Sequence, residues 1–267
     1  MMNPSFSVVL PYYNEADYLP QTLSCWVTQK RPPAEMILVD NASTDGSGEL
    51  CRSFLRPYEP WLTCRYVSED RAGKTRALET GCALAKCSWV VFSDADTYYP
   101  PGYLEILERL ILASSPKLVA VMALPVVGDA QRPLSIWHRR AYVILSKVFR
   151  KHVYTGGYGQ CLRADALRLS GGYREDLWPY VLGDHEVMSR VLKFGTSLYH
   201  PDFWCRSSPR RKDRRAVRWN LLEMALYHAT PFFLQGRFFT GFLGPRFAGR
   251  GLGARSLRHQ PWRIKGG

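Results

Sequence analysis

The stretch "SWVVFSDAD", residues 88–96, ends a short apolar run on two carboxylates, those of Asp94 and Asp96. Its aromatic and β-branched residues predict a buried strand that stops at a polar cluster. Three comparable runs precede it in the chain: "FSVVL" (6–10), "EMILVD" (35–40) and "TCRYVS" (63–68). The segments between these runs carry apolar residues at helical spacing. This alternation predicts an α/β fold, in which βαβ units build a mostly parallel central sheet flanked by helices.

A polar segment follows each of the four predicted strands. These segments are "PYYNE" (11–15), "DNASTDGS" (40–47), "EDRAGK" (69–74) and "DADT" (94–97). Ligands of open α/β sheets bind outside the carboxyl ends of the strands. We therefore expect the four segments to lie together and to form the binding site.

The composition is that of a globular protein, which sets the disordered and fibrous classes aside. Of the 267 residues, 46% are hydrophobic and 22% are charged. The cysteines number seven and include no C-x-x-C pair, so neither a disulfide framework nor a zinc site is indicated. The N-terminal residues lack a signal-peptide pattern, and no apolar run approaches the ~18 residues needed to span a bilayer. We expect a cytoplasmic protein that is soluble or lies on a membrane surface.

Asp94 and Asp96 are candidate ligands of a metal ion. If the predicted strand runs through Asp96, the two carboxylates point to the same side, because side chains two residues apart share a face of a strand. Their mutual repulsion is relieved by a cation, and Mg²⁺ or Mn²⁺ accepts carboxylate oxygens while keeping positions for phosphate. The alternative is a solvated turn before "YYPPG" (98–102).

The segment "VDNASTDGSGEL" (39–50) places an acidic residue at a strand end and small residues before a predicted helix. Ser43 or Thr44 is the predicted N-cap of that helix. Free N–H groups at a helix N-terminus favour phosphate, so a nucleotide could bind here. The alternative is that Ser43, Thr44 and Asp45 only cap the helix.

Four segments, in this order and at this spacing, resemble the nucleotide-binding half of glycosyltransferase family 2, whose fold is called GT-A. They are "VVLPYYNEADYLPQTL" (8–23), "ILVDNASTDGS" (37–47), "AGKTRALETG" (72–81) and "VVFSDAD" (90–96). The resemblance implies a nucleotide-sugar donor, usually linked to uridine diphosphate (UDP). It implies Asp40 at the uracil or ribose, Pro11, Asn14 and Glu15 in the same pocket, and Asp94 and Asp96 around a metal-bound diphosphate.

Two features of the nucleotide-binding half depart from known motifs. Many family members read D-D-G-S after the second strand, whereas this chain has Asn41 in place of the second acid. The tripeptide "GKT" (73–75) suggests a P-loop, but that motif requires glycine at position 68, where this chain has Ser68. Lys74 and Arg76 either lie at a helix start beside the donor or are solvated.

The stretch "LGDHEVMSRVLKFG" (182–195) reads as a helix closed by Gly195 and resembles the E-D-x-E element of the family. The resemblance implies that Asp184 is the catalytic base, and Glu186 is the second acid of the element. The chain departs from the family at Gly183, where Glu is usual. Without the resemblance, Asp184 would read as a helix N-cap.

The stretch "RRAVRW" (214–219) matches the R/Q-x-x-R-W element of family members of the cellulose synthase and ceramide glucosyltransferase type. The matching residues are Arg215, Arg218 and Trp219. The resemblance implies that the two arginines stabilise the departing diphosphate and that Trp219 packs against the acceptor.

We divide the chain into a catalytic domain, residues 1–205, and a basic amphipathic segment, residues 206–267. The formal net charge of the chain is +13, and the C-terminal segment carries 14 of the 36 Lys and Arg residues. The part "WNLLEMALYHATPFFLQGRFFTGFLGPRF" (219–247) is aromatic and apolar, unlike a nucleic-acid-binding arm. It either lies at an anionic membrane surface, with Arg237, Arg246 and Arg250 at the lipid headgroups, or packs on the core. The stretch "WHRRAYVILSKVFRKH" (137–152) could join that surface.

Together these features predict a metal-dependent, inverting glycosyltransferase on the cytoplasmic face of a membrane. Its acceptor is expected to be a lipid or a lipid-linked glycan, and its partners include no nucleic acid. A nucleotide-sugar-binding or scaffold protein of the same fold, with weak catalysis, is the alternative. A dinucleotide-dependent oxidoreductase is set aside because "PYYNEA" (11–16) lacks the glycine-rich turn that such a site needs.

Overall fold

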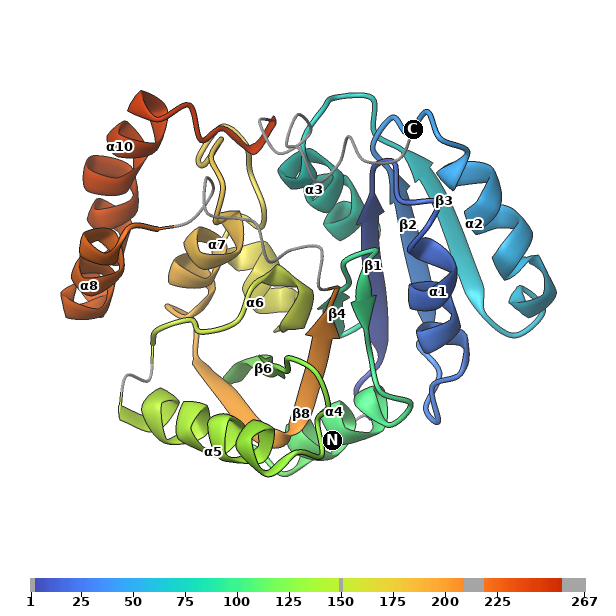
Figure 1. Ribbon diagram of the computed structural model, residues 1–267, viewed down its shortest axis with the longest axis horizontal. Coiled ribbons are helices and arrows are strands. Elements are labelled where there is room, and N and C mark those ends of the chain that lie inside the picture. The colour runs from blue at the N-terminus through green and yellow to red at the C-terminus, as the bar shows by residue number, and fades with distance from the viewer. Residues whose placement is uncertain (1–2, 149–150, 209–218, 256–267) are drawn as a thin grey trace.

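The computed structural model describes residues 3–148, 151–208 and 219–255. Its centre is an eight-stranded sheet with strand order β3-β2-β1-β4-β7-β6-β8-β5 (Figure 1). The strands are β1 (Phe6–Tyr12), β2 (Glu35–Asp40), β3 (Thr63–Ser68), β4 (Trp89–Phe92), β5 (Thr97–Tyr98), β6 (Leu118–Pro125), β7 (Gln160–Arg163) and β8 (Thr196–Ser207). The predicted α/β class is confirmed, and the four predicted strands correspond to β1, β2, β3 and β4.

Helices cover both faces of this sheet (Figure 1). They are α1 (Leu19–Val27), α2 (Ser47–Leu55), α3 (Lys74–Leu84), α4 (Tyr103–Leu112), α5 (Pro133–Val148), α6 (Ala164–Leu169), α7 (Gly183–Val191), α8 (Leu221–Ala229), α9 (Gln235–Arg237) and α10 (Gly244–Gly249). Shorter helical turns are η1 (Arg56–Tyr58), η2 (Gly157–Gly159) and η5 (Phe232–Leu234), and a π-helix, η6, spans Phe238–Leu243.

The first four strands run parallel, and their pairing aligns their carboxyl ends. Asp40 pairs with Tyr12 of β1 and with Ser68 of β3. On the other side of β1, β4 pairs in parallel up to Phe92. β7 is antiparallel to both β4 and β6, so the sheet changes direction beside β4. The polar segments that follow β1, β2, β3 and β4 therefore leave the same edge of the sheet.

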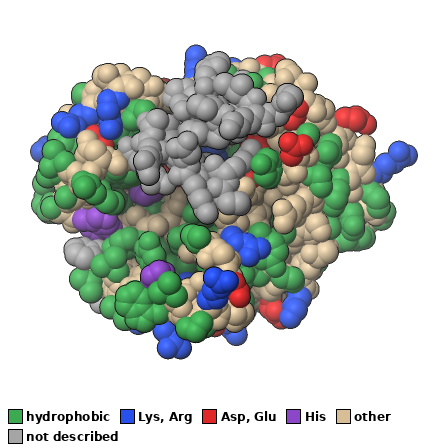
Figure 2. Space-filling view, in the orientation of Figure 1, with side chains coloured by type: hydrophobic (Ala, Val, Ile, Leu, Met, Phe, Trp, Pro, Cys, Tyr) green, Lys and Arg blue, Asp and Glu red, His purple; other side chains and the backbone are tan. Residues whose placement is uncertain are grey.

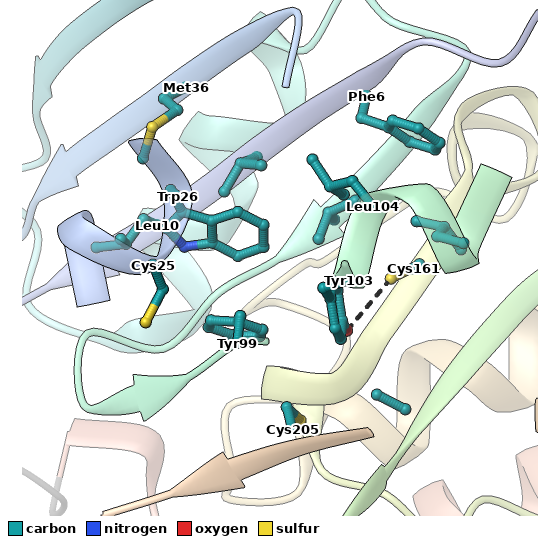
Figure 3. Close-up of a cluster of buried hydrophobic side chains, with 14 of the residues drawn as sticks. Phe6, Leu10, Cys25, Trp26, Met36, Tyr99, Tyr103, Leu104, Cys161 and Cys205 are labelled. Carbon is teal, nitrogen blue, oxygen red and sulfur yellow. Dashed lines mark hydrogen bonds between the residues drawn. The ribbon is translucent and has the colours of Figure 1, made fainter. Parts of the chain in front are cut away.

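Alternate residues of the central strands enter two hydrophobic clusters, one on each face of the sheet. Phe6, Val8 and Leu10 of β1 belong to the first cluster, which lies against α1, α2 and α4. Figure 3 shows part of this cluster, in which Trp26, Tyr99 and Tyr103 pack between the sheet and its helices. Val9 belongs to the second cluster, together with residues of α3, α6 and α7. Burial on both faces explains why these strands read as continuous apolar runs.

A third hydrophobic cluster joins the C-terminal segment to the rest of the chain. Phe238, Phe239 and Phe247 are buried against Trp178, and the cluster also includes Val181, Tyr227, Leu243 and Leu252. These phenylalanines therefore face protein, as expected for a segment packed on the core. The predicted boundary at residues 205 and 206 falls inside β8, and the division into two domains stays a prediction.

Two arginines of the C-terminal segment form ion pairs with a glutamate of the same segment. Arg246 and Arg250 contact the carboxylate of Glu223, at 3.3 and 2.9 Å, and that carboxylate is fully buried. Both arginines, predicted to meet lipid headgroups, thus have a protein partner. No helix within the described ranges is both long enough and apolar enough to cross a bilayer.

The helix predicted to end at Gly195 ends four residues earlier, at Val191. Gly195 has a different role, because a Cβ built on it would lie 2.1 Å from the carbonyl oxygen of Lys117. The glycine permits the backbone before β8 to approach the start of β6. Gly195 was predicted to end the helix, but its role is to allow this close approach of two backbone segments.

Candidate active site

The loops that follow β1 and β2 are joined by hydrogen bonds. Asn14 has a φ of 51°, a conformation that asparagine tolerates better than most residues. Its backbone N–H donates to Ser43 Oγ at 3.1 Å, and its Oδ1 accepts from Thr44 N–H at 2.8 Å. The backbone N–H of Glu15 donates to Ser47 Oγ at 2.9 Å. Asn14, Glu15 and Ser43, all predicted to bind nucleotide, therefore lie together.

Asp40 lies at the end of β2, beside these loops. Its Oδ1 accepts from Ser43 N–H at 2.8 Å. A Cβ built on Gly48 would lie 2.8 Å from its Oδ2, so a larger residue in the first turn of α2 would require the Asp40 side chain to shift. Pro11 lies in β1, past the last residue of β1 that pairs with β4, where its missing N–H breaks no bond to that strand. The structure thus brings Pro11 and Asp40 to one edge of the sheet.

The predicted N-cap of α2 at Ser43 or Thr44 is wrong. The helix begins at Ser47, preceded by Gly46 with a φ of 83°. Asp45 Oδ1 accepts from the N–H of Ser47 at 3.0 Å, and Oδ2 accepts from the N–H of Ala16 at 3.0 Å. Burial alone would raise the pKa of Asp45, but these bonds and the Ser47 hydroxyl hold that pKa below its ordinary value.

Asn41 fixes the loop between β3 and α3, a role that sequence reasoning missed. Its buried side-chain amide donates to the carbonyl oxygens of Glu69 and Arg71 at 2.7 and 2.8 Å, and its Oδ1 accepts from the N–H of Gly73 at 2.9 Å. An ionised aspartate could not donate these two bonds. The exchange of the usual acid for asparagine therefore serves the loop that presents Lys74.

Asp94 and Asp96 are both 6% exposed. β4 ends at Phe92 and β5 begins at Thr97, so Asp96 lies in the turn between two strands. The condition that the strand runs through Asp96 is therefore not met, and strand alternation does not orient this pair. Burial in a tight turn also contradicts the alternative of a solvated turn.

Lys74 is the first residue of α3 and forms an ion pair with Asp94. The prediction that Lys74 lies at a helix start is confirmed. The backbone N–H of Asp94 donates to Tyr99 Oη at 3.2 Å, which fixes the backbone that carries the first carboxylate. Arg76, two residues after Lys74, is instead paired with Glu175.

The donor set fits a hard divalent cation that also binds a phosphate. Magnesium and manganese are often held by one or two carboxylates, with substrate oxygens completing the shell. Asp94 and Asp96 supply two buried carboxylates, and Lys74 already places a cation against one of them. Within the described residues no group of three or more His, Cys, Asp or Glu side chains could hold a metal. A cation bound by this pair would thus need further ligands from a substrate or from solvent.

Asp184 lies in the first turn of α7, one residue after its first residue, Gly183. Its Oδ2 accepts from the N–H of Gly157 at 2.6 Å, and its Oδ1 lies 3.1 Å from Nδ1 of His185. Leu182 is the N-cap residue of α7, so the N-cap alternative for Asp184 is wrong.

The surroundings of Asp184 keep its carboxylate ionised. Burial by itself would raise the pKa of Asp184. His185, Lys74 and the N–H of Gly157 outweigh that effect and hold the pKa of the carboxyl below its ordinary value. Lys74 therefore acts on Asp184 as well as on Asp94.

A glycine-rich turn connects the two carboxylate sites. Tyr99 Oη donates to the carbonyl oxygen of Tyr158 at 2.9 Å, while the neighbouring N–H of Gly157 reaches Asp184. A Cβ built on Gly159 would lie 2.6 Å from a methyl group of Thr155 and 3.0 Å from the carbonyl oxygen of Ala123. The glycine at 159 therefore permits the close packing of this turn.

Glu186 has a structural partner. Its carboxylate makes two hydrogen bonds of 2.7 Å with Arg190, four residues later on α7. Arg190 also donates to the carbonyl oxygens of Ser170 and Gly172, so this pair anchors α7 to the preceding loop. A Cβ at Gly183 would meet Thr75 and Trp178 at 3.7 Å, an ordinary contact distance.

Trp219 lies near Asp184 through an aromatic contact with His185. The ring centroids of Trp219 and His185 are 5.4 Å apart, and Trp219 also packs against Tyr227 at 4.9 Å. The structure therefore connects Trp219 with the predicted base. Arg215 and Arg218 lie outside the described residues.

Solved structures share this architecture over almost the whole chain. The mannosyltransferase PcManGT from Pyrobaculum calidifontis, solved with GDP-Man and Mn²⁺, superposes with a TM-score of 0.70 at 23% identity and covers 99% of this chain and 79% of that one. Residues 1–349 of S. aureus TarS in complex with UDP-GlcNAc give a TM-score of 0.58 at 17% identity, covering 96% and 76%. The fold is therefore that of the GT-A glycosyltransferases.

Residues 7–162 match the sequence model of "Glycosyl transferase family 2". The chain therefore belongs to glycosyltransferase family 2, as its motifs predicted. It is 30% identical over 112 residues to the glycosyltransferase GlyA of Streptococcus pneumoniae, a match that covers 42% of this chain and 16% of GlyA. It is 33% identical over 165 residues to the undecaprenyl-phosphate 4-deoxy-4-formamido-L-arabinose transferase of Aeromonas hydrophila, covering 59% and 48%. The chain spans less than half the length of these relatives.

Proposed function

We propose that the protein is an inverting glycosyltransferase that moves a sugar from a nucleotide diphosphate donor, UDP-linked in our expectation, to a hydroxyl of a lipid or lipid-linked glycan. The observation that carries the proposal is the link between two acidic sites. Lys74 pairs with Asp94 and also lowers the pKa of Asp184, and the turn at 157–158 contacts both sites. Such an arrangement suits a donor on one side and an acceptor on the other.

The donor site in this proposal is formed by the polar strand ends. Asp40, Asn14 and Glu15 line the nucleoside side, and Lys74 meets the diphosphate. Mg²⁺ or Mn²⁺ held by Asp94 and Asp96 supplies charge neutralisation when it is bound. PcManGT, whose structure contains GDP-Man and Mn²⁺, supports a divalent cation, and TarS with UDP-GlcNAc supports a uridine donor.

The reaction transfers one glycosyl group with inversion. The acceptor oxygen forms a bond to the anomeric carbon while its O–H proton passes to Asp184. The bond from the anomeric carbon to the diphosphate oxygen breaks, and the nucleoside diphosphate leaves with the electron pair. Arg215 and Arg218 stabilise its charge. A carboxylate of lowered pKa serves here because the hydroxyl loses its proton mainly in the transition state.

The acceptor is proposed from the chemistry of the relatives and from the surface of the chain. One relative is named as a transferase for undecaprenyl phosphate, an isoprenoid lipid phosphate. The exposed apolar surface described in the next subsection suits an acceptor held in a bilayer. On this proposal the enzyme works at the cytoplasmic face of a membrane.

An Asp184→Asn variant tests the assignment of the base. The protein is incubated with a labelled nucleotide sugar, Mn²⁺ and total membrane lipids, and label is counted in the lipid extract. Loss of a positioned base should lower transfer by about 10²- to 10⁴-fold. Donor-induced thermal stabilisation should stay as in the unchanged protein, because Asp184 is assigned to the acceptor. Asp176→Asn, at an exposed aspartate, is the matched control.

Three outcomes would contradict parts of the proposal. Undiminished transfer by the Asp184→Asn variant would exclude Asp184 as the base. Label found only in water-soluble products would exclude the lipid acceptor. Full transfer in excess EDTA would exclude the divalent cation. Donor binding by the unchanged protein without any transfer would instead favour the scaffold alternative.

A further inference from the structure

Helix α5 carries its large apolar side chains on the outside of the molecule. Leu134, Trp137, Ile144 and Val148 are 65, 64, 65 and 69% exposed. Figure 2 shows hydrophobic side chains gathered on the lower left of the molecule, where α5 lies in Figure 1. Single exposed apolar residues are common on soluble proteins, but several gathered on one helix commonly mark a binding surface.

The exposed apolar residues of α5 form one stripe. Leu134, Trp137, Ile144 and Val148 are spaced three, seven and four residues apart, so at 3.6 residues per turn they occupy an arc of about 80°. The opposite side of the helix packs on the protein. There Arg139 is buried and donates to the carbonyl oxygen of Ala130 at 3.0 Å, and Val143 packs against the second hydrophobic cluster. The stripe thus points directly away from the sheet.

The charged side chains of α5 itself are of one sign. Residues 133–148 contain no Asp or Glu. Arg140 and Lys147 are exposed and lie along one side of the stripe, as the same helical spacing shows. Tryptophan, aliphatic side chains and flanking cations are the combination found in helices that lie in the interface of a bilayer.

A second exposed apolar group lies next to the end of α5. The chain after α5 returns to the C-terminal segment, where the Lys151 ammonium lies over the ring of Phe232 at 4.2 Å and His152 stacks on His228 at 5.3 Å. Phe233, next to Phe232, is 80% exposed, and Leu221, the first residue of α8, is 81% exposed. Apolar surface therefore continues from α5 toward α8 and η5.

We propose that α5, extended by Leu221 and Phe233, is a docking surface for an anionic lipid bilayer. The helix lies along the membrane plane with Trp137 and Ile144 below the headgroups and Arg140 and Lys147 at the phosphates. A second copy of the chain fits less well, because a symmetric contact would bring the like charges beside the stripe together. The inference rests on the proposed function in one respect, because the lipid-linked acceptor of that function is presented at the α5 surface.

Vesicle flotation with a paired variant tests this surface. The full chain is mixed with vesicles of phosphatidylcholine, with or without phosphatidylglycerol. The unchanged protein should float with the anionic vesicles and less so at high salt. The double variant Trp137→Gln with Ile144→Gln should lose at least tenfold in the bound-to-free ratio. The matched control is Trp61→Gln with Leu169→Gln, which changes two side chains that are 53 and 69% exposed on other elements and should float normally.

Three outcomes would overturn the proposed docking surface. Normal flotation of the Trp137→Gln and Ile144→Gln variant would show that lipid binds elsewhere. Absence of flotation by the unchanged protein would exclude the bilayer, and a dimer in light scattering that this variant abolishes would assign the stripe to a second copy. Donor-induced thermal stabilisation is measured on the same samples. A protein that floats but neither binds donor nor transfers sugar would refute the proposed function while leaving this surface intact.

Discussion

At the scale of single residues, the candidate site depends on Asn41 as much as on its acids. The amide of Asn41 holds two carbonyl oxygens and one N–H of the loop that precedes Lys74. Because the side chain is buried, water cannot replace bonds that it loses. Lys74 reaches Asp94 from the helix that this loop begins.

We expect Asn41→Asp to destabilise the protein, although the two side chains have nearly the same shape. The carboxylate would face the carbonyl oxygens of Glu69 and Arg71 without a hydrogen to donate. Loss of these bonds costs about 1–3 kcal/mol for each unsatisfied group. Urea denaturation measures the change, and the KM for the donor should rise because Lys74 is displaced.

Asn220→Asp is the matched control for that prediction. Asn220 Oδ1 only accepts, from the N–H of Glu223 at 2.8 Å, and aspartate serves equally well as an N-cap. Its unfolding midpoint should stay close to that of the unchanged protein. Equal stability of the two variants would refute the role assigned to the Asn41 amide.

Asp184 shows which part of the site the sequence could indicate. Its place in a motif pointed to a base, but not to the contacts that keep it ionised. These come from Gly157, His185 and Lys74, which lie on three different elements. Gly157 and Lys74 are distant from Asp184 in the chain, and such contacts depend on packing, so motif spacing alone could not predict them.

At the scale of elements, the turn η2 and the strand β7 that follows were the features least visible in the sequence. β7 is four residues long and antiparallel to its neighbours, so it lacks the long apolar run that identified β1 and β2. β1 and β2, by contrast, are buried on both faces, which gives a continuous signal. Strand prediction therefore succeeded for the first four strands, including the partly exposed β3, and failed beyond the change of direction, where even the buried β6 was missed.

We expect Gly159→Ala to weaken both stability and transfer. The added methyl group would lie within 3.0 Å of the Ala123 carbonyl oxygen and closer still to Thr155. Overpacking of this kind costs about 1–3 kcal/mol, and the shifted turn would move the N–H that holds Asp184. Thermal unfolding and kcat measure the two effects.

Gly236→Ala provides the control, because nothing lies within 4 Å of a Cβ built at that position. Helical alanine is favoured over glycine, so this variant should be as stable as the unchanged protein or slightly more so. A Gly159→Ala variant with normal kcat would show that the turn does not position Asp184.

At the scale of the whole molecule, one buried carboxylate connects the helices of the C-terminal segment. Glu223 on α8 accepts from Arg250 at 2.9 Å and from Arg246 at 3.3 Å, and it closes a capping box with Asn220. The segment is held to the body of the protein by the aromatic cluster around Trp178. Part of the positive charge of this region is therefore neutralised by the Glu223 carboxylate.

We expect Glu223→Gln to loosen this segment selectively. Breaking a buried ion pair costs several kcal/mol, but both arginines are partly exposed, so we expect about 1–2 kcal/mol. Limited proteolysis should cut faster within residues 219–255. Glu105→Gln, at an exposed glutamate, should leave the cleavage rate unchanged. Equal rates for both variants would exclude Glu223 as the connection.

At this scale, the amphipathic patterns of the sequence did not show which apolar faces are buried and which are exposed. Both α5 and the C-terminal segment read as apolar and basic, yet Phe238, Phe239 and Phe247 of the second are buried, whereas Trp137 and Ile144 of α5 are exposed. Periodicity shows that a helix has an apolar face but not what covers that face. Only the arrangement of neighbouring elements separates the two cases.

The shared turn at residues 156–159 limits how the enzyme could be redesigned. Tyr158 supports the backbone of Asp94 through Tyr99, and Gly157 supports Asp184. Directed evolution toward new acceptors that randomises this stretch would alter recognition of the donor at the same time. Libraries built at Trp219, which belongs to the acceptor side in our assignment, offer a way to vary one specificity without disturbing the other.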